Sequence, residues 1–251
     1  MGAKKKGGKK GGGKKGAKKS ADDEEDISTE KFWKLYRKKC VEYETDVVKE
    51  IKKLWEAKEE NGTDITKLHL WDELGWPGIK AITDALKASA DPCYQHLQSI
   101  RLWKTYCQDE GVRLLCTFLE KKCNVEGLDL LDNKITYIGC EQLARTLSPD
   151  GPHVPPPIKH LKLDHNMIGS RGCIALLQGI HTSQFIKILS LTYCNLDKDC
   201  SRAIFEMLIY SKSKIEKLYL GGNCLRNEGV IQVLQGVSAN KSLNELSLAD
   251  N

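Results

Sequence analysis

The chain has 251 residues, of which 40% are hydrophobic and 29% charged, and its net charge is +5 at pH 7. The sequence contains no run of about 18 apolar residues that could form a membrane span, and no apolar segment follows its basic start as in a secretory signal peptide. Lys6 stands where a myristoylation signal needs Ser or Thr. We therefore expect neither a membrane span nor a lipid anchor.

The first 26 residues form a segment of unusual composition. Residues 1–20 consist almost entirely of Lys, Gly and Ala and hold nine Lys and no acid, whereas residues 22–26 are all acidic. The basic charge therefore belongs to the tail, and the remainder of the chain is nearly neutral. Because this composition cannot bury an apolar core, we expect residues 1–26 to be disordered. The basic residues of the tail are Lys4, Lys5, Lys6, Lys9, Lys10, Lys14, Lys15, Lys18 and Lys19.

Residues 27–62 are predicted to form a helical N-terminal segment. One long helix is expected from about Ser28, a favourable N-cap, to Ala57, with Asn61-Gly62 as its end. Apolar residues recur every three to four positions along one stripe, which we expect to cap the start of the array that follows. A seam for a partner helix is the alternative, because the spacing is also close to a heptad. The stripe comprises Phe32, Tyr36, Cys40, Tyr43, Val47, Ile51 and Leu54.

From residue 63 to 251 one frame returns seven times: an aliphatic residue, two residues, an aliphatic, one residue and a further aliphatic. Successive copies are 28 to 33 residues apart. The frame predicts a short strand whose two aliphatic side chains point inward, followed by a helix. The last two aliphatics of the copies are Leu68/Leu70, Ile100/Leu102, Leu128/Leu130, Leu161/Leu163, Leu189/Leu191, Leu218/Leu220 and Leu246/Leu248.

Further positions of the frame have recognisable roles. The third residue after the last strand Leu is Asn133, Asn166, Cys194 or Asn223 in four central copies, and the Asn side chain is expected to bond backbone groups where the chain leaves the strand. A Gly four positions after the next apolar residue is expected to open the helix at a tight turn. The second copy departs from the frame, with Thr105 at the Asn position.

These residues resemble the ribonuclease-inhibitor-like subfamily of leucine-rich repeats over roughly residues 64–251. The resemblance implies an α/β fold, a right-handed horseshoe with a parallel sheet on the concave side and helices on the convex side, with about six full repeats and one truncated. Because no helix follows the seventh strand, we expect a longer array or a partner that supplies the cap. The subfamily includes enzyme inhibitors, GTPase activators, actin-filament cappers, innate sensors and axonemal components, so the resemblance leaves the function open.

Two copies are longer than the rest. Residues 88–96 form one insertion, and residues 148–157, which hold five of the seven Pro, form the other. We expect both to be tolerated surface loops. A binding role is the alternative, because insertions in solenoids gather on one face.

The sequence offers little for catalysis. It lacks a G-x-S-x-G elbow, a P-loop and a dinucleotide fingerprint. His160 and Asp164 should both face the concave surface, where a solvated polar strand explains them better than a metal or catalytic site. The ten Cys show no zinc-site spacing and are expected to be buried thiols, as at Cys107, Cys194 and Cys200, in a reducing compartment. We therefore predict no enzyme, cofactor or metal.

The outward positions of the predicted sheet are the best candidates for binding. Trp71, Trp103 and Leu131 occupy one column on the solvent face, where large apolar side chains are unusual. Trp with Arg beside it is typical of interface hot spots. Burial of the column under the N-terminal segment or an insertion is the alternative. The predicted partner-binding residues are Trp71, Trp103, Leu131, Arg101, Asp129, Lys162 and Tyr219.

These features predict a scaffold that binds a protein partner on its concave face. The basic tail would tether it to an acidic surface; a Lys/Gly-rich start before such an array is similar to that of some flagellar axoneme proteins, which implies tubulin tails and a cytoplasmic, cytoskeletal or ciliary setting. A nuclear adaptor that binds nucleic acid weakly through the tail is the first alternative. A regulator that activates a GTPase is the second.

Overall fold

The computed structural model describes residues 1–2, 27–88 and 93–251. The expectations for the Lys/Gly tail, namely its disorder and its basic residues Lys4 to Lys19, lie outside the described residues, as do positions 89–92 of the first insertion. Among the described helices, none combines the length and the apolar character needed to cross a membrane.

The repeats form a single parallel sheet in which the strands follow one another in chain order. Equivalent positions of neighbouring strands pair with one another, so that Leu68, Ile100 and Leu128 are direct neighbours on the side that faces the core. The predicted α/β solenoid is therefore confirmed. The strands are β1 (Lys67–Leu70), β2 (Ser99–Leu102), β3 (Gly127–Asp129), β4 (His160–Lys162), β5 (Ile188–Ser190), β6 (Lys217–Tyr219) and β7 (Glu245–Ser247).

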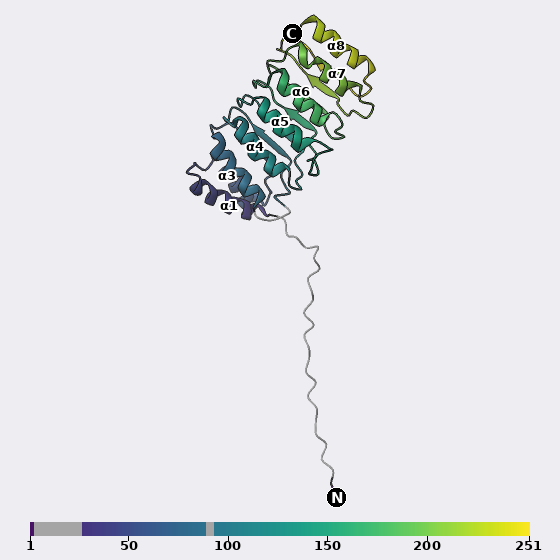
Figure 1. Ribbon diagram of the computed structural model, residues 1–251. Helices are drawn as coiled ribbons and strands as arrows, with labels where there is room; N and C mark the ends of the chain where they lie inside the picture. The colour runs from purple at the N-terminus through teal and green to yellow at the C-terminus, as the bar shows by residue number, and fades with distance from the viewer. Residues whose placement is uncertain (3–26, 89–92) are drawn as a thin grey trace.

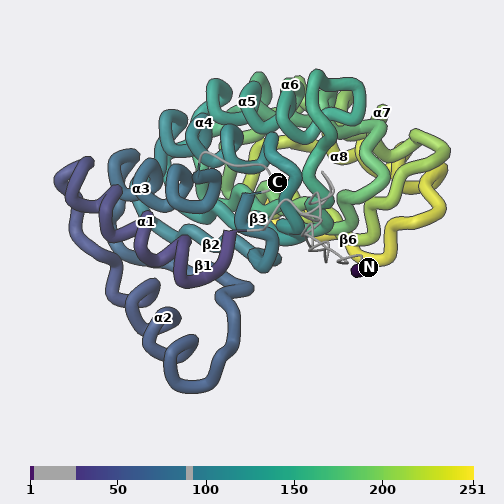
Figure 2. The backbone as a smooth tube through the Cα atoms, turned by 90° about the horizontal axis from the view of Figure 1, so that it is seen from below, coloured from purple at the N-terminus to yellow at the C-terminus, as the bar shows by residue number. Residues whose placement is uncertain are grey.

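The helices of the repeats stack side by side along the outer side of a curved path, with the strands along the inner side (Figures 1 and 2). Each helix presses its apolar face onto the sheet, so that the core lies between the two layers; Leu115, Leu143 and Leu176 are almost fully buried. The helices are α3 (Gly75–Lys87), α4 (Gln108–Leu119), α5 (Tyr137–Leu147), α6 (Gly169–Ile180), α7 (Ser201–Ile209) and α8 (Arg226–Ala239), with a short 3₁₀ turn η1 (Lys198–Cys200) before α7.

The Asn side chains form a ladder where the chain leaves the strands. The Oδ1 atom of Asn133 accepts hydrogen bonds from the backbone N–H groups of Thr105 and Cys107, at 3.0 and 3.2 Å. Asn166 accepts in the same way from Asn133 N and Ile135 N, at 2.9 and 3.0 Å. The predicted backbone bonding is confirmed, and each Asn also bonds the preceding repeat. The ladder therefore joins the repeats to one another and satisfies buried backbone groups.

Glycine is required near the helix starts for a different reason from the one that we expected. Gly111 and Gly139 do not have a positive φ, so the prediction that they serve a tight turn was wrong. A Cβ atom at Gly139 would lie 2.6 Å from Cγ2 of Ile135, and one at Gly111 would lie 2.4 Å from Sγ of Cys107. Glycine is needed there because the inward side chain four residues earlier packs against the helix backbone.

The N-terminal segment contains two helices, so the single helix expected from Ser28 to Ala57 was wrong. Helix α1 (Thr29–Glu42) and helix α2 (Lys49–Asn61) are separated by a turn in which Glu44 has a φ of 51°. The predicted N-cap is confirmed, because Oγ of Ser28 accepts from Lys31 N at 3.2 Å. The β-branched residues at 45–48 disfavour a helix there, and the turn allows both halves of the apolar stripe to reach the core.

Helix α1 lies against α3 at the first end of the array (Figure 1). Its Phe32 and Tyr36 are 1% exposed, and Tyr36 Oη accepts a hydrogen bond from Val48 N at 3.1 Å, which fixes the turn between the two helices. The aromatic ring of Trp33 on α1 stacks on that of Trp55 on α2, with centroids 5.8 Å apart. The segment thus covers apolar surface that the first repeat would otherwise expose.

Two described residues of the first insertion are buried, and the prediction of a surface loop was wrong for them, whereas Gln95 and His96 are half-buried. Cys93 and Tyr94 are fully buried. The Tyr94 hydroxyl donates to Ile65 O at 3.0 Å, accepts from Ile65 N at 3.1 Å and contacts Thr29 Oγ1 at 2.7 Å. This residue therefore joins the N-terminal segment to the first strand. The second insertion is more open, and Val154 in it is 88% exposed.

All ten Cys lie within the described residues, nine of them buried and Cys224 exposed. The expected burial of Cys107, Cys194 and Cys200 is confirmed. Burial raises the pKa of Cys116 to about 12 and that of Cys194 to about 12, which suppresses the reactive thiolate at neutral pH.

We expect one thiol of the native chain to react rapidly with Ellman's reagent and all ten to react in denaturant, because Cys224 alone is accessible. Absorbance of the released chromophore gives the count. The variant Cys224→Ser should lower the native count to none and leave nine reactive thiols in denaturant. A second fast thiol in that variant would contradict the buried positions assigned to the others.

Candidate protein interface

The parallel register places three of the predicted binding residues side by side. Arg101 on β2 pairs with Asp129 on β3, which pairs with Lys162 on β4. All three project from the concave face at the same position of the frame. Tyr219 occupies that position on β6 and is separated from Lys162 by β5. Of the four predicted binding residues that lie on strands, three are therefore neighbours, and Tyr219 lies apart from them.

Tyr219 belongs to a separate polar cluster with the seventh strand. Its hydroxyl donates to Glu245 Oε1 at 2.7 Å, and this hydrogen bond is the main cause of the raised pKa of Tyr219. Lys217 Nζ lies 2.6 Å from Glu245 Oε2. The phenol is thus engaged within the protein.

The apolar column directly follows the first three strands. The side chains of Trp71 and Trp103 are 58% and 37% exposed, and Leu131 is half-buried. The described parts of the N-terminal segment and of the first insertion thus leave both indoles accessible to solvent. We expected the indoles to be neighbours; the ring of Trp103 instead lies 4.8 Å from the guanidinium carbon of Arg101, a cation–π contact, and among the described residues neither indole stacks on the other.

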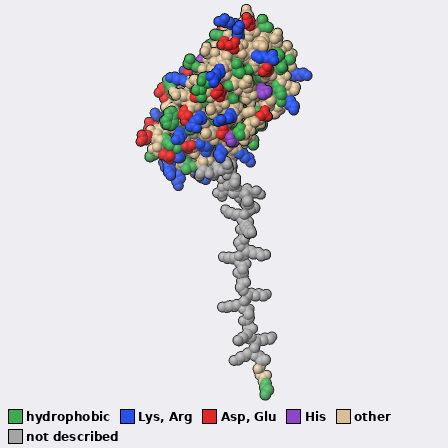
Figure 3. All heavy atoms as spheres, viewed as in Figure 1, with side chains coloured by type: hydrophobic (Ala, Val, Ile, Leu, Met, Phe, Trp, Pro, Cys, Tyr) green, Lys and Arg blue, Asp and Glu red, His purple; other side chains and the backbone are tan. Residues whose placement is uncertain are grey.

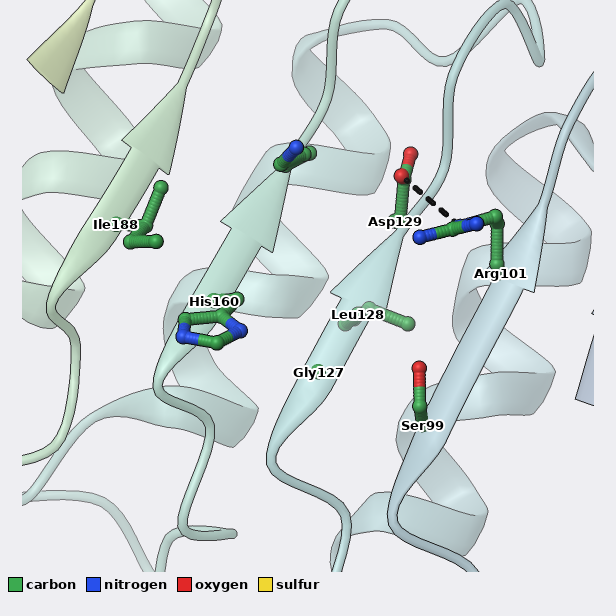
Figure 4. A pocket seen from close by; sticks show the side chains of 8 residues that line it. Ser99, Arg101, Gly127, Leu128, Asp129, His160 and Ile188 are labelled. Atoms are coloured by element: carbon green, nitrogen blue, oxygen red, sulfur yellow. Dashed lines mark ion pairs between the residues drawn. The ribbon is translucent and has the colours of Figure 1, made fainter. Parts of the chain in front are cut away.

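A hollow of about 150 Å³ opens in the sheet beside Arg101 (Figure 4). It exists because Gly127 on β3 has no side chain, whereas its register partners Ser99 and His160 do. The sequence motifs did not predict this hollow. The only signal for it was the Gly in a column of otherwise larger outward residues. Its lining is Ser99, Arg101, Gly127, Leu128, Asp129, His160, Lys162 and Ile188.

The charges around the hollow are incompletely paired. Arg101 Nε lies 3.5 Å from Asp129 Oδ2, as the dashed line in Figure 4 marks, which is too long for a good hydrogen bond. Arg101 Nε and Asp129 Oδ1 are both buried atoms without a hydrogen-bond partner. Lys162 forms no ion pair with any residue in the described ranges. Two cations therefore face one carboxylate, and the hollow carries a net positive charge.

Two histidines beside the hollow have lowered pKa values, which favours the neutral imidazole. Burial lowers the pKa of His160, and the nearby Lys162 lowers it further. Burial also lowers the pKa of His69, with Arg101 as the second cause, and Nε2 of His69 lies 3.3 Å from Ser99 Oγ. A neutral imidazole offers one N–H donor and one acceptor, so His160 adds a polar group to the hollow without adding charge.

Asp164 has a structural role. Its Oδ1 atom accepts hydrogen bonds from Ser190 Oγ at 2.6 Å and from Thr192 N and Oγ1 at 2.8 and 2.6 Å. The carboxylate therefore ties the fourth repeat to the fifth. Within residues 27–88 and 93–251, no group of three or more His, Cys, Asp or Glu side chains is arranged to hold a metal ion.

Positive and negative side chains are mixed over the face of the repeats that Figure 3 shows, in agreement with the nearly neutral charge of this part of the chain. Many form ion pairs between adjacent repeats, such as Lys159 with Glu126 and Lys187 with Glu216. Exposed pairs of this kind contribute little stability each.

Comparison with known proteins agrees with this architecture. The family described as "Leucine Rich repeat" matches residues 154–177. The human NACHT, LRR and PYD domains-containing protein 13 is 32% identical over 168 residues, which are 66% of this chain and 15% of that protein. The mouse ribonuclease inhibitor is 25% identical over 187 residues, 73% of this chain and 39% of the inhibitor. The chain spans well under half the length of these relatives.

Similarity to the pig ribonuclease inhibitor is of the same order, at 29% identity over 143 residues, 56% of this chain and 30% of the inhibitor. The repeated frame, the parallel sheet with helices on one side and the Asn ladder account for these similarities, and leucine-rich repeats of this type form scaffolds for protein–protein interaction. The chain is therefore a leucine-rich-repeat solenoid that is similar in sequence to the ribonuclease inhibitors.

Proposed function

We propose that this chain is a non-enzymatic scaffold that binds a protein partner on its concave face. The observation that carries the proposal is the exposure of Trp71 and Trp103 near Arg101 on the concave face of the sheet. Exposed indoles on a solvent face are unusual, and Trp and Arg are the residues most enriched among interface hot spots. The surface thus has the composition of a binding anchor.

The backbone beneath this anchor is held by the sheet. Trp103 N donates to Leu70 O at 2.9 Å, and Lys104 N donates to Leu131 O at 3.0 Å. A side chain on a fixed backbone loses little freedom when it binds, which lowers the entropic cost of association. The ribonuclease inhibitors among the relatives are named for an action on another protein, which also favours a protein partner.

The test is the double variant Trp71→Ala/Trp103→Ala. Truncation of a hot spot costs about 2 kcal/mol or more, so we expect at least about thirtyfold weaker binding of partners captured by the unmodified chain. Trp76→Ala is the matched control, because Trp76 is 48% exposed but lies on α3. Thermal melts of both variants should first match the unmodified chain. Equal affinity of the double variant and the control would refute binding through the concave column.

We also propose that the basic tail tethers the scaffold to an acidic polymer such as a microtubule, in a cytoplasmic setting that is cytoskeletal or ciliary. Nine Lys within residues 1–20 support the proposal, because such a cluster attracts an acidic surface in a salt-dependent way. Deletion of residues 1–20 should leave the melting temperature unchanged and weaken sedimentation with microtubules. Tighter binding to duplex nucleic acid than to microtubules would favour the nuclear alternative.

A further inference from the structure

The hollow at Gly127 is large enough to hold the end of one side chain. Gly127 is the only glycine in its column, where the other strands present Lys67, Ser99, His160, Ile188, Lys217 and Glu245. One water molecule occupies roughly 30 Å³ in the liquid, so a volume of about 150 Å³ accommodates several waters or the end of one side chain. The missing Cβ is what opens this space, as Figure 4 shows between Ser99 and His160.

The charges of the hollow select an anion. Arg101 and Lys162 approach from the strands on either side of β3, and Asp129 between them balances only one of the two. Lys162 has no ion-pair partner in the described part of the chain, and Arg101 Nε is buried without an acceptor. An incoming carboxylate would supply acceptors to both cations in charge-assisted hydrogen bonds, the strong class of such bonds.

The charges and the apolar side chain that line the hollow favour a carboxylate over a phosphate or an apolar group. A phosphate carries more than one negative charge and would meet the carboxylate of Asp129, whereas a single carboxylate matches the net charge of the hollow. An apolar group would leave the buried Arg101 Nε and Asp129 Oδ1 atoms without hydrogen-bond partners, which is costly. Ile188 forms an apolar wall that suits the methylene groups of a Glu side chain.

We propose that the Gly127 hollow binds the carboxylate of a Glu or Asp side chain in an acidic segment of the protein partner. The inference rests on the proposed concave-face binding and specifies the chemistry of the partner. Arg101 and Lys162 hold the carboxylate, while Trp103, against which the Arg101 guanidinium packs, contacts the residue next to it. Recognition of this kind is the acidic-motif mode, in which basic side chains at fixed positions read an anion.

The experiment measures fluorescence-anisotropy binding of a labelled hexaglutamate peptide to the 251-residue chain. The nine tail Lys are replaced by Gln throughout, so that the tail contributes no background. Lys162→Glu is expected to weaken binding about tenfold or more, because it removes one charge-assisted contact and adds repulsion. Lys212→Glu is the matched control, since it makes the same charge change at an exposed loop position outside the hollow and should leave the affinity nearly unchanged.

A second variant fills the space without a change of charge. Gly127→Val should be accepted by the backbone, because a Cβ at this position would lie 3.4 Å from Ser99 Oγ and its φ is not positive. It should weaken hexaglutamate binding about as much as Lys162→Glu. Equal affinities of the Lys162 and Lys212 variants, or unweakened binding by Gly127→Val, would overturn the proposal. The proposed concave-face binding is tested separately by Trp71→Ala/Trp103→Ala. If that variant loses the partners that the unmodified chain captures, concave-face binding stands even when the carboxylate site is refuted.

Discussion

Leu163→Ala is expected to lower the free energy of unfolding by about 2–5 kcal/mol. Leu163 is fully buried and directly follows β4 in the central repeat, between Leu130 and Leu191, which are also fully buried. Removal of its side chain leaves a cavity that the neighbouring repeats cannot close, because each strand is fixed in register on both sides. Urea unfolding followed by circular dichroism measures the loss.

The matched control for this variant is Leu248→Ala, at the same position of the frame in the seventh repeat. Leu248 is half-buried, and its repeat pairs with a neighbouring strand on one side only among the described residues. The loss there should be clearly smaller, because less contact is removed and the site can relax. An unchanged unfolding midpoint for Leu163→Ala would mean that the repeat register described here is incorrect.

Asn166→Ala is expected to lower the free energy of unfolding by about 1–3 kcal/mol. The side chain accepts from Asn133 N and Ile135 N, and its Nδ2 donates to Leu130 O and Leu163 O, both at 2.8 Å. The Ala variant leaves two buried N–H groups and two buried carbonyl groups without hydrogen-bond partners. The decrease in unfolding free energy reflects the cost of keeping these groups away from water. The same urea experiment gives the value.

A milder change at this position separates hydrogen bonding from side-chain volume. Cys194 stands at the Asn position one repeat later, where its Sγ donates to Leu163 O at 3.2 Å. Asn166→Cys retains a weak donor and should therefore lose less stability than Asn166→Ala. Asn124→Ala, which removes one exposed hydrogen bond to Gln95 O, should have almost no effect. An Asn166→Ala loss as small as that of Asn124→Ala would contradict the ladder.

The repeat architecture was predictable because its causes are local and recur. The strand pairs Leu161/Leu163 and Leu189/Leu191 must point inward wherever a short strand alternates, and the spacing between copies leaves room for one helix. The role of Asn166 followed from the need to bond buried backbone groups. That it bonds the preceding repeat could not be read from the sequence, because the partner lies 31 residues away from it at Ile135.

Predictions failed where a contact from outside the local segment decided the structure. The N-terminal stripe has helical spacing throughout, yet Tyr36 Oη accepts from Val48 N and holds a turn in the middle of it. Tyr94 lies in an insertion that resembles a polar loop, but its hydroxyl finds backbone partners at Ile65. In both cases a buried aromatic hydroxyl determines the local path of the chain.

The sequence by itself determined the register of the repeats and thereby the row Arg101, Asp129 and Lys162, because in-register parallel strands place equivalent positions side by side. Only the tertiary structure decided how these side chains are used. The Arg101 guanidinium lies against Trp103 and not within hydrogen-bond distance of Asp129, and the absent side chain of Gly127 becomes a hollow only when Ser99 and His160 stand beside it. The periodicity of the repeats determines the position of each residue in the sheet. The direction and the partners of its side chain depend on packing between residues far apart in the chain.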